Sequence, residues 1–537
     1  MNLFNNKQKY YPFALVVAFS ALAWMFRFIQ DDAFISFRYA KNFAEGYGLV
    51  YNPGEKVEGY TNFLWTMFLT IPHFFHLDII NFSQAAGVLL FAFSLFLTFR
   101  ITKTLTGSYY FASLALIFTG SNFTFLSYAT GGLETQLFTF LLMMAFDIAL
   151  HINNKNNRQL FAISLIFALL MLTRPDAVLF IAIILLYLFY KMHSFQCDFK
   201  NYTILIFPFI LISASYLAWK LSYYGDILPN TFYAKLSTGT SKGYGTYYVF
   251  TFFKSYMIIL FPLLVFVLMK KKLLSVEIIA LLIIVMVNVL YIVFVGGDFM
   301  EFRFFVPVIP AFFILTVLTL KAMKQKLLIL ILSLIIMAGT ISHAFAFKSE
   351  PGHQLFSIKE LNGQIYDPNF SWMKIGKCFN KYFNNSNITI ATTAAGVIPY
   401  FSNLRTVDMH GLNDRQIART GIKSGNRPGH QKLAAFNYLM EKDVNILIGH
   451  PFVMWNTFNS EKITAVQFRN YFMYDLNNLP ADASIIKMPI DNGYCLFFIY
   501  LQRNRFIDDV IRKKGWEATT VATLFKHIAY SSPAKQF

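Results

Sequence analysis

The sequence predicts a polytopic α-helical membrane protein with a C-terminal extracytoplasmic α/β domain. Of its 537 residues, 56% are hydrophobic and only 14% are charged, whereas soluble domains carry about 25% charged residues. Apolar runs of about 20 residues, the length that crosses a bilayer, recur as far as residue 346. Beyond that point the chain becomes hydrophilic, and short strand-like runs alternate with helical stretches.

Eleven membrane-spanning helices are expected from these apolar runs. The first follows Lys7 and Lys9. Ala21-Leu-Ala23 resembles a signal-peptidase site, but the apolar run continues beyond it through Trp24-Met-Phe, so we expect an uncleaved span. The segment 63–80 is apolar too, but a full crossing there would reverse the side of every later loop; we expect an outer-leaflet or re-entrant element. The predicted spans are 11–29, 84–102, 108–127, 135–151, 159–173, 176–191, 202–219, 256–270, 276–295, 304–320 and 327–346.

The basic residues give the orientation. The formal net charge is +18, but the Lys and Arg residues cluster in short loops on one side, which is the positive-inside pattern of a cytoplasmic face. This excludes nucleic acid as the expected partner and predicts a multi-pass protein of a bacterial inner membrane with a periplasmic C-terminal domain. The cytoplasmic residues are Arg100, Lys103, Lys155, Arg158, Lys191, Lys270 to Lys272, Lys321, Lys324 and Lys326.

Two parts follow from this pattern: a membrane module over 1–346, with its first outer loop at 30–62, and a soluble α/β domain over 347–537. Cys378 and Cys495 both fall in the outer domain. An oxidising compartment permits a disulfide between them, and two buried free thiols are an equal alternative, because sequence does not show proximity.

The first outer loop holds the candidate catalytic residues, Asp31 and Asp32. Charge is costly beside hydrocarbon, so a carboxylate pair at the mouth of a membrane helix is a functional candidate. Either residue could instead cap the following helix. The pair could also hold a divalent cation, since hard oxygen ligands suit Mg²⁺, Mn²⁺ or Ca²⁺; the metal requirement stays open, and no other cofactor is expected.

Carboxylates and arginines on one membrane face suit glycosyl transfer from a lipid-phosphate sugar. A carboxylate accepts the proton of the acceptor hydroxyl, and a fixed cation stabilises the departing phosphate. No G-x-G-x-x-G follows a predicted strand, which agrees with a donor that lacks a nucleotide. The expected partners are a polyprenyl-phosphate sugar, an envelope glycan acceptor and membrane lipid. The candidate phosphate-binding cations are Arg38, Arg174, Lys235 and Arg303.

These motifs resemble a known family. The run from Asp31 to Tyr39, with Gly48 to Asn62, resembles the first outer loop of the terminal β-(1→2) arabinofuranosyltransferases of the GT-C superfamily. The resemblance implies a GT-C fold and an inverting transfer, with Asp31 or Asp32 as the base and an outer domain that helps to hold the acceptor. The residues expected to bind substrate are Glu58, Tyr60, Asn62, Glu134, Asp176, Asp226, Asn230, Asp298, Asp408 and Asp414.

Alternatives remain open at this point. The donor could carry a pentofuranose or another sugar, and the acceptor could be protein or lipid A instead of an envelope glycan. A lipid-linked sugar transporter or flippase is the rival outside enzymes. Transporters often contain paired repeats and mid-membrane polar sites, and neither is evident here. Arg174-Pro-Asp176 could simply end a span, and Asp298 with Arg303 could be an interfacial ion pair.

Overall fold

The computed structural model describes residues 2–152, 156–235, 241–256, 274–348, 355–384, 387–425, 427, 429–491 and 493–524. The chain forms two compact units. Unit 1 contains residues 1–29, 61–227 and 237–358, and unit 2 contains residues 30–60, 228–236 and 359–537. The sequence had suggested a single boundary at residue 346. Instead, the first outer loop and the segment 228–236 belong with the C-terminal domain.

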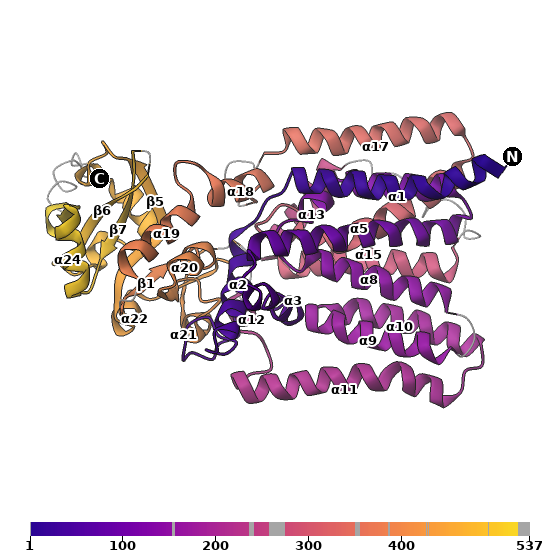
Figure 1. Ribbon diagram of the computed structural model, residues 1–537, viewed down its shortest axis with the longest axis horizontal. Helices are drawn as coiled ribbons and strands as arrows, with labels where there is room; N and C mark the ends of the chain where they lie inside the picture. Colours follow the sequence, from indigo (N-terminus) through magenta and orange to yellow (C-terminus); the bar gives the residue numbers. More distant parts are fainter. Residues whose placement is uncertain are drawn as a thin grey trace. The chain divides into compact units, whose positions relative to one another are not determined.

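Unit 1 is helical, and its long helices run side by side (Figure 1). Its elements are α1 (Asn2–Met25), α3 (Phe63–Phe68), α4 (Ile71–Phe74), α5 (Ile79–Thr106), α6 (Tyr109–Ser121), α7 (Phe123–Ser127), α8 (Thr135–His151), α9 (Asn157–Thr173), α10 (Ala177–Ser194), α11 (Phe199–Tyr224), α13 (Ser241–Ser255), α15 (Val276–Val295), η2 (Arg303–Val308), α16 (Ile309–Met323) and α17 (Lys326–Ala346).

The predicted spans largely coincide with these helices. Among the described residues, six helical segments are long and apolar enough to cross a membrane, and five further apolar segments are shorter. The predicted span at 256–270 falls almost wholly outside the described residues. The ambiguous segment 63–80 forms the short helices α3 and α4 before α5 begins, so it contains no single helix of spanning length.

Local sequence explains where a long helix of unit 1 starts and stops. Asp78 caps α5 by accepting a hydrogen bond from the Asn81 amide. Gly107 ends the same helix in the left-handed region, at φ 66°, where glycine avoids the steric cost of a side chain. By contrast, α16 is buried along almost its whole length, as expected for a helix that is apolar all round and lies inside a bundle.

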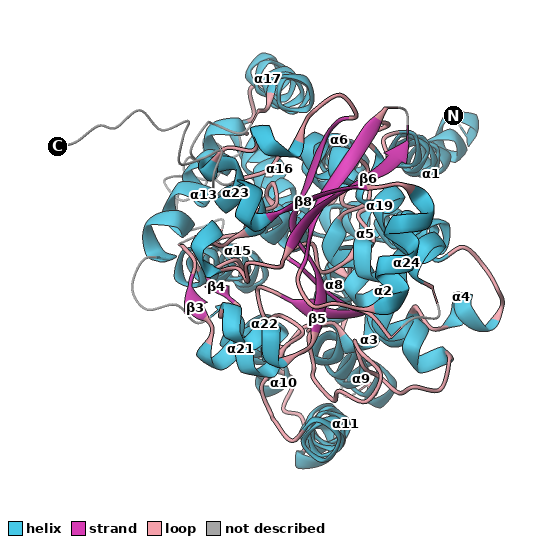
Figure 2. Ribbon diagram, turned by 90° about the vertical axis from the view of Figure 1, so that its left-hand side faces the viewer, coloured by secondary structure: helices cyan, strands magenta, loops and turns pink. Residues whose placement is uncertain are grey.

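Unit 2 is built on a six-stranded sheet with the order β2-β1-β5-β7-β6-β8. The first three strands pair in parallel, and the others pair antiparallel. Figure 2 shows β5, β6 and β8 of this sheet in magenta. The strands are β1 (Thr389–Thr392), β2 (Arg405–Asp408), β5 (Val444–Trp455), β6 (Ser484–Asp491), β7 (Tyr494–Tyr500) and β8 (Glu517–Thr520), with β3 (Ile422–Lys423) and β4 (Lys432–Leu433) forming a separate ribbon.

Helices cover both faces of this sheet. Adjacent residues of a strand point to opposite faces. On β7, Phe498 contacts Phe379 of α19, whereas Phe497 contacts Phe452 of β5, which stacks on Tyr471 of α23. The helices of unit 2 are α2 (Asp31–Ala44), α12 (Asn230–Lys235), α18 (Ile358–Tyr366), α19 (Trp372–Phe383), α20 (Val397–Ser402), α21 (Arg415–Thr420), α22 (Phe436–Glu441), η3 (Ser460–Lys462), α23 (Ala465–Phe472), η4 (Leu476–Asn478) and α24 (Arg505–Lys514). The expected α/β domain is therefore present, and Cys378 and Cys495 are both free thiols.

Candidate functional site

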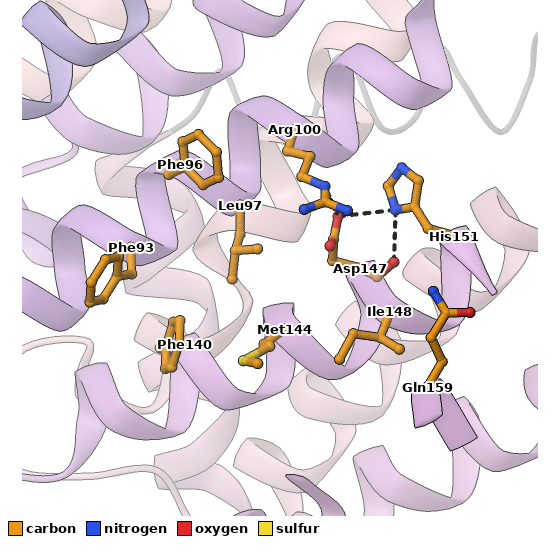
Figure 3. Close-up of a pocket in the computed structure, with 10 residues that line it drawn as sticks. All are labelled: Phe93, Phe96, Leu97, Arg100, Phe140, Met144, Asp147, Ile148, His151 and Gln159. Carbon is orange, nitrogen blue, oxygen red and sulfur yellow. Dashed lines mark hydrogen bonds and ion pairs between the residues drawn. The ribbon is translucent and has the colours of Figure 1, made fainter. Parts of the chain in front are cut away.

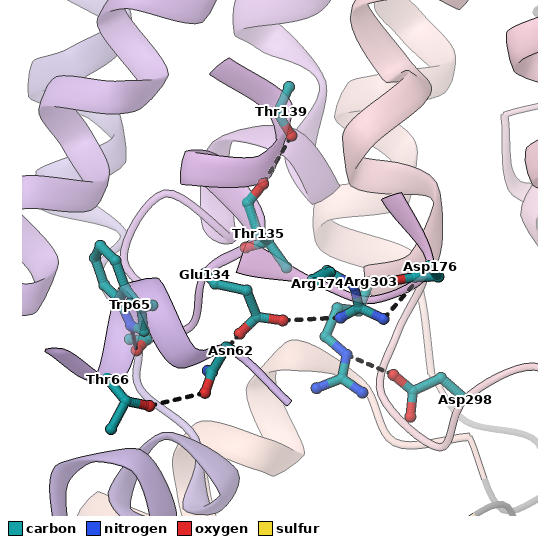
Figure 4. A network of polar contacts seen from close by, with 11 residues as sticks. Asn62, Trp65, Thr66, Glu134, Thr135, Thr139, Arg174, Asp176, Asp298 and Arg303 are labelled. Atoms are coloured by element: carbon teal, nitrogen blue, oxygen red, sulfur yellow. Dashed lines mark hydrogen bonds and ion pairs between the residues drawn. The ribbon is translucent and has the colours of Figure 1, made fainter. Parts of the chain in front are cut away.

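A network of arginine, carboxylate and amide groups lies in unit 1, where α8 begins and α9 ends (Figure 4). Arg174 Nη1 lies 2.8 Å from Glu134 Oε1. Its Nε and Nη2 donate to the two carboxylate oxygens of Asp176, at 2.9 and 3.1 Å. Glu134 Oε2 in turn accepts a 2.8 Å hydrogen bond from Asn62. The structure therefore brings together four of the residues that the sequence singled out.

A second ion pair joins this region of unit 1. Arg303 Nε lies 2.6 Å from Asp298 Oδ2, although the two groups are not aligned as a good hydrogen bond. Figure 4 shows the Arg303 guanidinium beside the Asp298 carboxylate, joined by this contact. Arg174 and Arg303 line one cavity of about 20 Å³, and their guanidinium carbons lie 5.8 and 5.2 Å from the centre of the Phe304 ring. The two arginines thus share an aromatic neighbour.

The loop that carries Arg303 is fixed by a glycine turn and by hydrogen bonds to neighbouring residues. Gly297 has φ 74°, and a side chain there would come within 2.9 Å of Tyr248, so this turn requires glycine. The Tyr248 hydroxyl donates to the Met300 carbonyl at 3.1 Å. Glu301 is buried and accepts hydrogen bonds of 2.8 Å from His343 and from the Ile358 amide. These contacts fix the loop, which is the condition for placing a guanidinium accurately.

Three residues near the two arginines were not among the predicted site residues. Asn288 and Tyr291 of α15, together with Phe304, line the same cavity. Asn288 donates to the Phe304 carbonyl at 3.2 Å. The sequence contained a signal for Asn288 and Tyr291. They are polar residues three positions apart in a very apolar helix, so they share one helical face.

The charges of this network decide what it could bind. Arg174 and Arg303 face Glu134, Asp176 and Asp298, and the ion-paired atoms are largely buried. Buried charges persist only when they are paired and hydrogen-bonded. A cavity of about 20 Å³ has room for no more than a water molecule. A phosphate would therefore have to replace a carboxylate, such as that of Asp298, which lies 2.6 Å from Arg303.

Asp31 is fixed within unit 2. One carboxylate oxygen accepts a 3.0 Å hydrogen bond from the Gly396 amide, and the other accepts a 2.7 Å bond from the Val397 amide. A side chain at position 396 would collide with the backbone oxygen of Asp31, at 1.8 Å. Asp32 follows on the same helix, and both aspartates are half-buried. The Asp31 carboxylate is therefore held in one orientation without being sealed from solvent.

The environment of Asp31 changes its protonation. Burial raises the pKa of Asp31 to about 7, against the opposing effect of the two amide hydrogen bonds, and the neighbouring charge of Asp32 raises that pKa further. A general base works best when its pKa lies near the working pH. Asp31 thus has the ionisation that proton abstraction near neutral pH requires.

Arg38 occupies a different environment from the one expected of a phosphate ligand. Its guanidinium donates to the carbonyls of Tyr51, Pro399 and Leu404 and to the Asn52 side chain, at 2.5 to 3.1 Å. Burial lowers its pKa, and its carbon Cζ lies 4.5 Å from the centre of the Tyr51 ring. The guanidinium is committed to protein acceptors, so Arg38 joins the first outer loop to the C-terminal domain and is not available for a phosphate.

Three further predicted residues stabilise turns of unit 2. Asp408 accepts bonds from the His410 and Asn413 amides at 3.0 and 2.9 Å, and burial raises its pKa to about 6. Asp414 caps α21 and accepts a bond from Tyr438 at 2.8 Å. Asn230 donates to the carbonyls of 411, 412 and 414. These side chains connect segments of unit 2, and their placement gives them structural partners.

The remaining predicted residues are distributed over both units. In unit 2, Glu58 and Tyr60 are buried, and the Tyr60 ring lies 4.9 Å from that of Tyr39. Lys235 is exposed in the same unit, and Asp226 is half-buried in unit 1. Among the residues that the structure describes, no group of three or more His, Cys, Asp or Glu side chains is arranged to hold a metal ion.

Two protein-family models match this chain. Residues 50–368 match the model of the Alg9-like mannosyltransferase family, and residues 359–510 match that of a domain of unknown function. The terminal β-(1→2)-arabinofuranosyltransferase of Mycobacterium tuberculosis is 24% identical over 259 residues. That alignment covers 45% of this chain and 40% of the relative, so the chain matches about two fifths of that protein's length.

Two solved structures share the fold. ArnT from Cupriavidus metallidurans, bound to undecaprenyl phosphate, superposes with a TM-score of 0.56 at 11% identity, over 90% of this chain and 97% of that chain. The arabinofuranosyltransferase AftD from Mycobacteria superposes with a TM-score of 0.51 at 11% identity, over 91% of this chain and 40% of that chain. At these identities the likeness concerns the fold, which is that of the GT-C membrane glycosyltransferases.

Proposed function

Because the chain belongs to the Alg9-like mannosyltransferase family, we propose that it transfers a sugar from a polyprenyl-phosphate donor to an envelope glycan. The reaction takes place at the outer face of a bacterial inner membrane and inverts the anomeric centre. The family match over residues 50–368 carries this proposal. The ArnT structure, which contains undecaprenyl phosphate, supports a lipid-phosphate donor by analogy of fold.

Asp31 is assigned the role of general base. The acceptor hydroxyl loses its proton to Asp31 as its oxygen bonds to the anomeric carbon of the donor sugar. The bond between that carbon and the phosphate oxygen breaks, and its electron pair leaves with the polyprenyl phosphate. The two amide bonds to the Asp31 carboxylate orient the base, and Asp32 tunes its pKa.

Arg303 and Arg174 are assigned to the leaving group. The departing phosphate gains negative charge in the transition state, and a planar guanidinium can bind two of its oxygens. Arg303 contacts Asp298 through Nε, so a phosphate that displaces this carboxylate would meet the guanidinium. Arg174 is held by Glu134 and Asp176, so it acts mainly through its positive charge.

The donor sugar and the acceptor are narrower parts of the proposal. A pentofuranose donor is supported by the 24% identity to a terminal arabinofuranosyltransferase and by the motifs of the first outer loop. The envelope glycan is preferred as acceptor for the same reason. Transfer to lipid A or to protein uses the same base and the same leaving group, so the alternative acceptors are outcomes of the test.

Mass spectrometry of whole cells tests this function. Envelope glycans, lipid A and polyprenyl-phosphate sugars are compared in wild-type cells, in a deletion strain and in a strain that carries only Asp31→Asn. We expect one terminal sugar to vanish from a glycan while its lipid-phosphate donor accumulates. Loss of the sugar from lipid A or protein would keep the transferase and correct the acceptor. Unchanged glycans, lipid A, protein and donor pools in the deletion strain would contradict the proposed function.

A further inference from the structure

A cavity of about 280 Å³ lies between α5 and α8, where α9 begins (Figure 3). Along α5 it is lined by Phe93, Phe96, Leu97 and Arg100, and along α8 by Phe140, Met144, Asp147, Ile148 and His151, with Gln159 from α9. On both helices the side chains are apolar first and polar at the C-terminal end, with the three-to-four-residue spacing of one helical face. The cavity is therefore apolar over most of its lining and polar at the end formed by the C-termini of α5 and α8.

The cavity and the arginine network lie at opposite ends of α8. Glu134 precedes this helix, and His151 is its seventeenth and last residue, so about 25 Å of helix separates the two ends. Lys and Arg residues gather in the loops at the cavity end, which the positive-inside pattern places in the cytoplasm. The cavity is therefore separate from the proposed transfer site and belongs to the other membrane leaflet.

The apolar wall is open to lipid. Phe93 and Phe96 are 46% and 53% exposed, in a helix that qualifies as a membrane span. In a bilayer such rings meet acyl chains. A cavity that begins among lipid-facing rings and ends at ionisable side chains has the polarity of a single phospholipid, with the acyl chain along the phenylalanines and the head group at the helix ends.

The polar end has a mixed charge. Asp147 is 3% exposed, and its Oδ1 lies 3.3 Å from Arg100 Nε and from His151 Nδ1. Neither contact has hydrogen-bond geometry, and this buried oxygen has no hydrogen-bond partner. The His151 nitrogens are occupied by the Asp147 carbonyl and by Thr104, both at 2.9 Å. A buried carboxylate oxygen without a donor is costly, which indicates a missing donor.

Gln159 adds a second acceptor. Its Oε1 is buried and likewise has no hydrogen-bond partner. Two unsatisfied acceptors call for a group with several N–H donors, and a primary ammonium has three. Arg100 is half-exposed on the same cavity and suits a phosphate. We propose that this cavity binds a phospholipid whose head group carries a phosphate and a primary ammonium, the chemistry of phosphatidylethanolamine.

Other head groups fit these side chains less well. A purely anionic head group, such as phosphatidylglycerol, brings no ammonium to Asp147 or Gln159. Phosphatidylcholine keeps the phosphate but replaces the ammonium hydrogens with methyl groups, so it cannot donate to Asp147 or Gln159. Comparing the three lipids therefore separates the ammonium contribution from the phosphate contribution and from acyl-chain packing.

Native mass spectrometry of the full-length protein with each lipid added in turn tests the proposal. We expect phosphatidylethanolamine to bind about tenfold more tightly than phosphatidylcholine or phosphatidylglycerol, since only its head group has an ammonium that can donate hydrogen bonds to the buried carboxylate. Asp147→Asn should abolish that preference. Arg158→Gln, at an exposed cation of the same membrane face that does not line the cavity, should preserve it.

A second variant guards against misfolding of Asp147→Asn. Leu97→Trp fills the apolar wall and leaves every charge in place, so it should reduce binding of all three lipids at this site while the protein still melts cooperatively. The comparison of the three lipids on the wild-type protein does not depend on any variant. Equal binding of the three lipids would indicate non-specific lipid binding, and a preference for phosphatidylglycerol would indicate an anion site. Either result would overturn the proposal.

Discussion

Asp31 and Arg38 stand seven residues apart on the same helix and have opposite roles. The Asp31 carboxylate is oriented by two backbone amides, remains half-buried and has a pKa near neutrality. The Arg38 guanidinium is surrounded by four acceptors of the protein itself. In the sequence both were charged residues of the first outer loop, and both were predicted to belong to the site. Only the identity of their neighbours separates a reactive group from a structural one.

The pH dependence of activity tests the base. Asp31 must be ionised to accept a proton, so kcat/KM should fall as the pH drops below about 7. The charge of Asp32 raises the pKa of Asp31; Asp32→Asn removes that repulsion and should therefore move the acidic limb to lower pH, with turnover retained. The measurement is the pH profile of both proteins between pH 5 and 9.

The reverse pattern would exchange the two roles. If Asp32→Asn abolishes turnover while Asp31→Asn retains it, Asp32 is the base. Asp78→Asn is the matched control, because Asp78 also accepts a backbone hydrogen bond at a helix start but lies outside the proposed site. That variant should leave the pH profile unchanged.

Arg303 should matter more for the donor than for the fold. Arg303→Ala removes a cation from the leaving phosphate, and we expect kcat/KM for the donor to fall by about 100-fold, the loss typical of one transition-state contact. Steady-state kinetics with varied donor measure this effect. Arg27→Ala, at an exposed arginine of unit 1, is the control. Equal kinetics for the two variants would remove Arg303 from the site.

At the scale of elements, helix α2 joins the first outer loop to the C-terminal domain. Arg38 contacts residues more than 360 positions away, and the Tyr51 hydroxyl donates to the Ala395 carbonyl at 2.6 Å. Asn52 exchanges two hydrogen bonds with the backbone of Thr406. The loop is therefore folded as part of unit 2, and the position of Asp31 depends on the integrity of that unit.

Arg38→Met should destabilise unit 2. The substitution leaves several buried carbonyls without a donor, and we expect a loss of about 2–4 kcal/mol, given the cost of unsatisfied buried groups. Hydrogen exchange of residues 395–406 in the full chain measures it, and protection there should fall. Arg505→Met, at an exposed arginine of α24, should leave that protection intact. Unchanged exchange in Arg38→Met would contradict the structural role.

The sequence predicted the helices of unit 1, but it did not predict which segments of the chain form unit 2. Apolar periodicity and helix length are local properties, so spans such as 135–151 and 276–295 coincide with α8 and α15. The pairing of Asn62 with Glu134, and of Arg38 with Pro399, depends on long-range packing. No local pattern records such a contact, so the sequence did not show that Arg38, a predicted phosphate ligand, donates to acceptors of the protein itself.

The whole molecule combines a helical membrane unit and an α/β unit that incorporates the first outer loop. The helices of unit 1 carry the paired arginines at one end and the lipid cavity at the other. If the cavity end is cytoplasmic, the arginines face the outer side, where a nucleotide-free donor is used. Orientation in the membrane is therefore the property on which the proposed chemistry depends.

Reporter fusions test that orientation. Fusions after Gly107 and after Phe195, which follow the basic ends of α5 and α10, should report the cytoplasm. A fusion after Gly225, which follows α11, should report the periplasm. A matched pair of reporters, one active on each side, controls for expression. Periplasmic signals at both of the first two positions would invert the topology and separate the arginines from the outer face.

The central claim is that this chain moves a sugar from a polyprenyl phosphate with Asp31 as the base. The most direct measurement is sugar transfer by the purified protein in lipid nanodiscs, with a lipid-linked donor pool and an envelope extract as acceptor. The account predicts release of polyprenyl phosphate with glycosylation of one acceptor by the wild type, and loss of both by Asp31→Asn that remains folded. Equal transfer by the two proteins, or none by the wild type with any donor of the pool, would contradict it.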